Sequence, residues 1–195
     1  MTEHPFIAKT IITMDKIILT SEKLSESYLS FLDVLAKEEQ SIVDHDIQKY
    51  EAHGHSKQEI AARILDDYQK LSSYCESICE AAIERHLKIS TAEKLTNVVI
   101  IFNEVLEQVD ADEISKRIFK TQVDKVESAI EKLVKIQSDS KDLVERNVIL
   151  VERLIDNHRQ SYQFWREAIA KETVGYNEKG RRSTSHSVSM FNARA

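Results

Sequence analysis

Apolar residues recur every three or four positions along most of the chain, which is the spacing of helices that bury one face. The most regular run lies near the end of the sequence, where spacings of four and three alternate as in a coiled-coil seam. This pattern predicts a long last helix with a narrow apolar stripe. Its members are Val144, Val148, Val151, Ile155, His158, Tyr162, Trp165 and Ile169.

The same spacing predicts three earlier helices. The first begins near Pro5, because proline is tolerated in a first helical turn, and extends to about Gln40. The second follows a cap at Ser56 and ends near Leu87. The third starts at residues 90–93, whose sequence Ser-Thr-Ala-Glu has the pattern of a capping box.

Short polar stretches predict where these helices are interrupted. Asp44-His45-Asp46 predicts a turn and a new N-cap, followed by a short polar segment that ends near Gly54. Asp110-Ala111-Asp112 indicates a kink or a break in phase within the third helix. Ser138-Asp139-Ser140 predicts the turn before the last helix, which we expect to stop at a left-handed cap on Gly175.

Glycine and proline are nearly absent, with 3 Gly and 1 Pro in 195 residues. Sandwiches, barrels and α/β folds need such residues at short intervals in their turns. We therefore predict an all-α fold, an elongated antiparallel bundle of three to five long helices joined as coiled-coil-like hairpins. The expected organisation is one helical domain over residues 1–172 and a flexible, basic, Ser-rich tail over residues 173–195, which holds too little apolar surface to fold alone.

Charge and cysteine content indicate the cellular compartment and the class of partner. The net charge is −6, and because the tail carries +3, the helical part carries −9, which disfavours nucleic acid as a partner. The apolar stretch at residues 7–19 is interrupted by three charges, so we expect neither a signal peptide nor a membrane span. Cys75 and Cys79 lie one turn apart on one helix face, which suits small buried residues in a reducing cytoplasm.

No arrangement of residues indicates an enzyme. His86, in Arg85-His86-Leu87-Lys88-Ile89, lies in a sequence similar to that of phospho-accepting histidines in phosphotransfer bundles, but Ile89 stands where those proteins have glycine. The alternative is a solvent-facing histidine at a helix end. His45, His53 and His55 lie within eleven residues and are either metal ligands or ordinary surface histidines. We expect no cofactor.

Three stretches resemble flagellar export chaperones of the FlgN type. They are Leu35-Ala36-Lys37-Glu38-Glu39-Gln40 with Asp46 and Tyr50 downstream, Glu145-Arg146-Asn147, and the terminal Gly175-Tyr176-Asn177-Glu178-Lys179-Gly180-Arg181 followed by serines and Phe191-Asn192-Ala193-Arg194-Ala195. The sequence departs from the family pattern at Asn177, which replaces a glycine, and at Asp44-His45, which replaces a small turn. Residues 1–30 read as an extension.

The resemblance implies a cytoplasmic chaperone that binds hook-associated subunits of the hook–filament junction and delivers them to the flagellar type III export apparatus. Such clients carry amphipathic terminal helices that polymerise when uncovered. No nucleotide or metal is implied.

The partner-binding residues that we expect are those of the last helix, because its seam ends in large aromatic side chains. They are Val148, Val151, Ile155, Tyr162, Trp165 and Ile169, joined by Tyr176 as a docking residue for the export apparatus. Three alternatives stay open. The seam is the core of a monomer or homodimer, as in another helical adaptor or a structural coiled coil; Tyr176 folds back on the last helix; or the chain is a phosphotransfer module.

Overall fold

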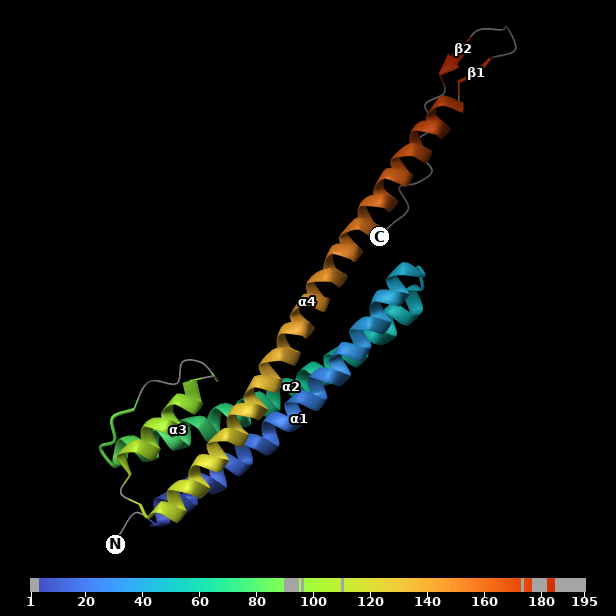
Figure 1. Ribbon diagram of the computed structural model, residues 1–195. Helices are drawn as coiled ribbons and strands as arrows, with labels where there is room; N and C mark the ends of the chain where they lie inside the picture. The colour runs from blue at the N-terminus through green and yellow to red at the C-terminus, as the bar shows by residue number, and fades with distance from the viewer. Residues whose placement is uncertain are drawn as a thin grey trace. The chain divides into compact units, whose positions relative to one another are not determined.

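The computed structural model describes residues 4–89, 95, 97–109, 111–172, 174–176 and 182–184. In this part of the chain the elements are α1 (His4–Val43), α2 (Ile47–Glu84), α3 (Asn97–Gln108), α4 (Glu113–Glu172), β1 (Val174–Tyr176) and β2 (Arg182–Thr184) (Figure 1). The predicted all-α bundle is therefore confirmed. The chain divides into two compact units, Met1–Asn147 and Val148–Ala195, and the continuous helix α4 contributes to both.

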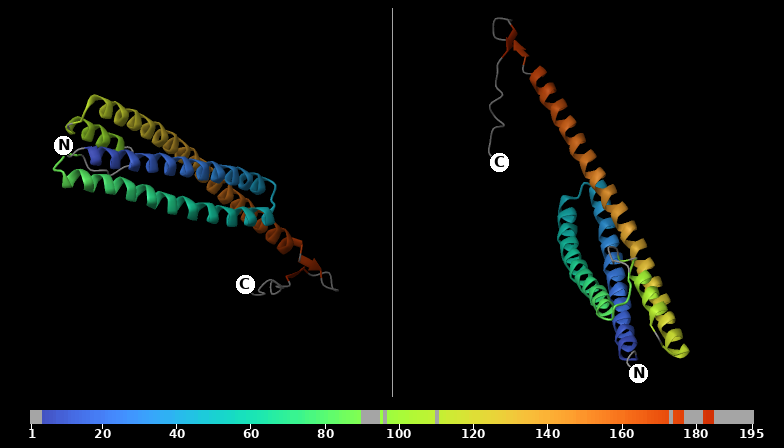
Figure 2. Two further views of the ribbon diagram at one scale, coloured as in Figure 1. Left: turned by 90° about the horizontal axis from the view of Figure 1, so that it is seen from below. Right: turned by 90° about the vertical axis from the view of Figure 1, so that its left-hand side faces the viewer.

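The first unit is built on an antiparallel pair, α1 and α2, joined by a tight turn (Figures 1 and 2). The short helix α3 and the first part of α4 complete its core at the end where α1 begins. Apolar residues at helical spacing supply most of the buried side chains. The largest of these are Phe102, Phe119, Met14, Ile17, Leu24, Leu35, Leu71, Ile101, Ile130 and Leu133.

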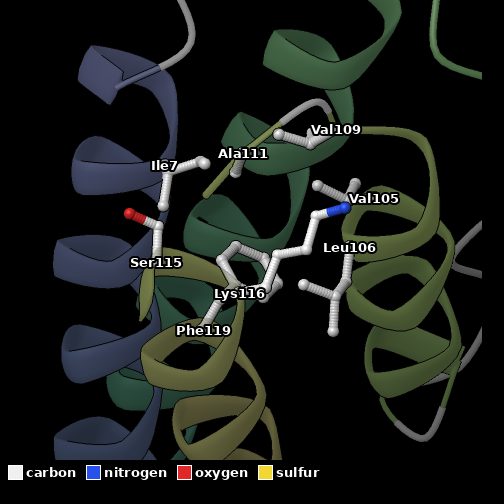
Figure 3. A pocket seen from close by; sticks show the side chains of 8 residues that line it. All are labelled: Ile7, Val105, Leu106, Val109, Ala111, Ser115, Lys116 and Phe119. Carbon is white, nitrogen blue, oxygen red and sulfur yellow. The ribbon is translucent and has the colours of Figure 1, made fainter. Parts of the chain in front are cut away.

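A small cavity lies in this core. The small cavity beneath Ile7 of α1, Val105 of α3 and Phe119 of α4 has a volume of about 10 Å³ (Figure 3). A space of that size holds one water molecule at most. Close packing of this kind gives the unit its stability, and it leaves no room for a small-molecule ligand there.

Helices α1 and α2 end in the same way. In each, a histidine adopts a left-handed backbone conformation, with φ of 56° at His45 and 59° at His86. The following amide donates to a carbonyl five residues earlier: Asp46 N to Ser41 O at 3.0 Å, and Leu87 N to Ala82 O at 3.1 Å. These are Schellman caps in which histidine stands at the position that usually holds glycine.

Two aspartates cap helices at polar stretches of the sequence, and the first of these caps, at Asp46, was predicted. The Asp46 carboxylate accepts from the Lys49 amide at 3.1 Å, which begins α2 and lowers the pKa of that carboxyl. Asp112 accepts from the Ser115 amide at 2.9 Å at the start of α4, so the phase break expected at residues 110–112 is a full boundary between α3 and α4. The capping box predicted at residues 90–93 lies outside the described residues.

Two predicted helix boundaries were wrong. Residues 47–56 belong to α2, so Ser56 does not cap its start and Gly54 lies inside the helix. Ser138-Asp139-Ser140 lies inside α4, where the buried Ser140 hydroxyl donates to the Ile136 carbonyl at 2.8 Å. A serine hydroxyl can donate to the carbonyl four residues earlier in the same helix, so a serine-rich stretch does not have to interrupt the helix.

The second unit contains the rest of α4 and a small hairpin. Helix α4 ends at Glu172, and Gly175 is not its cap but a residue of β1, paired with Ser183. Antiparallel pairing also joins Val174 to Thr184 and Tyr176 to Arg182. At residues 174–176 and 182–184 the segment expected as a structureless tail therefore forms two strands.

Candidate protein-binding surface

The predicted binding residues of α4 are in large part exposed to solvent. Tyr162 and Trp165 are 62% and 63% exposed, and Val148, Ile155 and Ile169 are also exposed, while Val151 is half-buried. With their spacings of three, four and seven they lie on one face of α4. We call these six residues the apolar stripe.

The stripe differs from the earlier seam of the same helix in its surroundings and not in its pattern. Between Phe119 and Leu133 the apolar residues of α4 are buried against α1, α2 and α3. From Val148 onward residues of the same type and spacing are exposed. Contiguous exposed apolar area of this kind is typical of surfaces that bind another protein.

The stripe contains two large aromatic side chains, Tyr162 and Trp165, and a third, Phe164, lies beside it. Phe164 is 67% exposed, and its ring meets the ring of Trp165 edge to face, with centroids 5.9 Å apart. Tyr and Trp contribute strongly to binding because each offers a large rigid surface at a low cost in conformational entropy. His158, which the sequence places in the seam, is exposed as well.

A polar cluster that the sequence did not predict lies in the first unit. Glu38 of α1 is 2% exposed, and its carboxylate accepts from Lys57 Nζ of α2 and from Asn147 Nδ2 of α4, the latter at 3.0 Å. The same Asn147 amide donates to the Leu35 carbonyl at 2.9 Å. These residues tie three helices together. The sequence did contain a sign of this cluster. Leu35, Glu38 and Ile42 are spaced like residues of one buried helix face, so a charged side chain occupies a position expected to be apolar.

An exposed ion pair lies beside this cluster. Arg146 Nη2 of α4 is 2.6 Å from Glu39 Oε2 of α1. Two of the stretches quoted for the chaperone resemblance, 35–40 and 145–147, are thus in direct contact. Their contact has a structural explanation, since both contribute to the joint between α1 and α4.

A shallow groove also runs between α1 and α4 in the first unit, with a volume of about 650 Å³. Tyr28 and Phe31 line one side, and Val134, Lys141 and Val144 line the other. Gln137 Nε2 lies 3.4 Å from the Tyr28 hydroxyl, and burial raises the pKa of that phenol. Lys141 and Glu145, whose charged groups lie 3.7 Å apart, also line the groove, so its surface is partly apolar and partly charged.

The remaining candidate residues do not converge. Burial raises the pKa of the Cys75 thiol to about 12 and also raises that of Cys79, so neither thiol ionises near neutral pH. His86 is exposed at the end of α2. Among the described residues no group of three or more His, Cys, Asp and Glu side chains is placed to hold a metal ion. Tyr176 lies in β1 opposite Arg182.

Comparison with known proteins gives no relative. No family model, no curated protein and no solved structure matches the chain. Among the described residues, no helix is long and apolar enough to span a membrane.

Proposed function

We propose that the protein is a non-enzymatic chaperone that holds an amphipathic helix of a partner against the apolar stripe of α4. The observation that supports this function is the exposure of a stripe whose members keep coiled-coil spacing over residues 148–169. A partner helix with apolar residues at matching intervals would insert them between those of α4 and cover both apolar faces.

The partner class follows from what such a stripe can do. A protein whose terminal helices are amphipathic self-assembles when they are uncovered, and a helix that covers them keeps it monomeric. The resemblance to FlgN-type chaperones makes hook-associated subunits of the flagellar junction the proposed clients, with delivery to the export apparatus in the cytoplasm. Tyr176 is the proposed docking residue for that apparatus.

A second candidate is self-association, as in an adaptor or a structural coiled coil. It is favoured by the same uninterrupted spacing, because two copies of α4 would match each other in register. Sedimentation of the purified protein separates the two. A chaperone whose stripe does not pair with a second copy stays monomeric at micromolar concentration, whereas a coiled-coil protein forms a stable dimer.

The test of the chaperone function is Trp165→Ala, measured by binding to a peptide of the C-terminal helix of a junction subunit. Because Trp165 is exposed, we expect a loss of binding of about 2 kcal/mol or more, the range of a hot-spot residue. The free energy of unfolding should change little, since the loss of about 3–5 kcal/mol seen on aromatic truncation belongs to buried positions such as Phe119.

The matched control is Ile149→Ala. Ile149 is also exposed but lies on the other side of α4, because the sixteen residues between it and Trp165 amount to a rotation of about 160° around the helix. Its replacement should leave peptide binding unchanged. Equal effects of the two substitutions on binding, or a Trp165 variant that unfolds without a selective effect on binding, would show that the stripe is not the client site.

A further inference from the structure

The hairpin of the second unit returns the chain to the end of α4. Strand β1 begins two residues after the last residue of α4, and antiparallel pairing places Thr184 opposite Val174. Because β2 runs antiparallel to β1, Thr184 lies near the end of α4, and eleven residues of the sequence follow it.

These eleven residues contain three of the larger apolar side chains of the tail. Val188, Met190 and Phe191 lie within four positions of one another, between serines and a small, basic end. Phe191 and Met190 are large apolar side chains, and each gains free energy from burial against another apolar surface.

The length of this segment matches the aromatic end of the stripe. Measured back from Glu172, Trp165 is about 10 Å and Tyr162 about 15 Å along α4, at about 1.5 Å per residue. Phe191 is seven residues beyond Thr184, a span of roughly 23 Å when extended. The segment reaches both aromatic residues with slack, whereas Val148, about 36 Å from the helix end, lies beyond the reach of Phe191.

We propose that the C-terminal segment, residues 185–195, covers the aromatic end of the apolar stripe when no partner is bound. Met190 and Phe191 pack on Tyr162 and Trp165, and a client helix must displace them. A tethered segment acts at an effective concentration in the millimolar range, so even a weak contact keeps the surface covered. This inference rests on the proposed function, because it assigns to the tail the regulation of that surface.

Trp165 makes the test direct, because it is the only tryptophan in the chain. The experiment compares the full-length protein with its Met190→Ser/Phe191→Ser variant by tryptophan emission and by acrylamide quenching. We expect the double substitution to shift the emission to longer wavelength and to increase quenching. The control is Ser187→Ala/Ser189→Ala, which alters the same segment without removing its apolar side chains and should leave both signals unchanged.

Dilution distinguishes the tail from a second copy of the chain. Coverage by the protein's own tail does not depend on protein concentration. Coverage that disappears on dilution belongs to an intermolecular contact and overturns the inference, as does identical quenching of the full-length protein and the double variant.

Peptide binding distinguishes a failure of this inference from a failure of the proposed chaperone function. If the tail covers Trp165 and a client is bound, the double variant binds the junction peptide more tightly than the full-length protein. If tail substitution exposes Trp165 but no peptide binds either protein, the inference stands and the chaperone function fails. If Trp165→Ala abolishes peptide binding while the double variant leaves the emission unchanged, the function stands and the inference fails.

Discussion

At the residue scale, His45 and His86 show how the protein ends its helices without glycine. A left-handed backbone brings the β-carbon of an L-residue close to the next carbonyl, and glycine avoids that contact. The chain has 3 Gly in total, and none stands at these two caps. The cap at His86 is stabilised because Leu87, which follows it, packs against the core and Ala82 is buried.

His86→Gly should therefore stabilise the protein. Glycine relieves the strain of the left-handed backbone, and this stabilisation exceeds the destabilisation from the larger conformational entropy of the unfolded chain. We expect the free energy of unfolding, measured by urea denaturation, to increase by roughly 0.5–1 kcal/mol. His86→Val keeps the strain and adds a branched side chain, so it should lower stability. An unchanged midpoint in both variants would mean that the left-handed cap carries no strain.

At the element scale, α2 and α4 are longer than their polar stretches suggest. Gly54 lies within α2, and a β-carbon added at this position would meet no atom within 4 Å. A glycine inside a helix costs roughly 0.5–1 kcal/mol relative to alanine. Helix α2 tolerates this cost because its apolar face packs along α1, with Ile60, Leu71 and Cys75 buried.

Gly54→Ala should raise the free energy of unfolding by roughly 0.5–1 kcal/mol, because the helix gains propensity and nothing collides. Thermal denaturation followed by circular dichroism measures the change. Gln58→Ala, one turn further along the same exposed surface, serves as the control and should shift the midpoint much less. A destabilised Gly54 variant would indicate that α2 is bent or broken at this point in solution.

At the scale of the whole molecule, the cluster of Glu38, Lys57 and Asn147 joins α1, α2 and α4 in the first unit. A buried carboxylate is tolerated only when it is paired and hydrogen-bonded. Asn147 contributes two donated bonds, and its Oδ1 has no partner among the described residues. The cluster thus fixes which residues of the three helices face one another.

Asn147→Ala should lower the free energy of unfolding by about 1–3 kcal/mol, because the Glu38 carboxylate and the Leu35 carbonyl each lose a donor in a buried site. Arg146→Ala, at the neighbouring residue, removes an exposed ion pair and should cost less than about 1 kcal/mol. Urea denaturation of the two variants measures both values. Similar costs would show that water reaches the Glu38 site.

The sequence by itself determined the class of fold and several of the helix boundaries. The spacing of apolar residues identified the helices, Asp46 marked a helix start because its side chain satisfies a local backbone amide, and residues 110–112 marked an interruption. These are contacts between neighbours in the chain. The resemblance to export chaperones and the role of Tyr176 stay predictions.

Only the tertiary structure decided which apolar seams are buried. The residues from Phe119 to Leu133 and those of the apolar stripe have the same pattern, and the difference in their exposure comes from the helices that lie against the first set. Only the tertiary structure showed that α2 continues through Gly54 and α4 through Ser140. At both positions helical hydrogen bonding and packing outweigh the local preference of these residues for a turn. The Glu38 cluster needs residues 38, 57 and 147 together, and no local spacing predicts such a meeting, because it depends on how the helices pack.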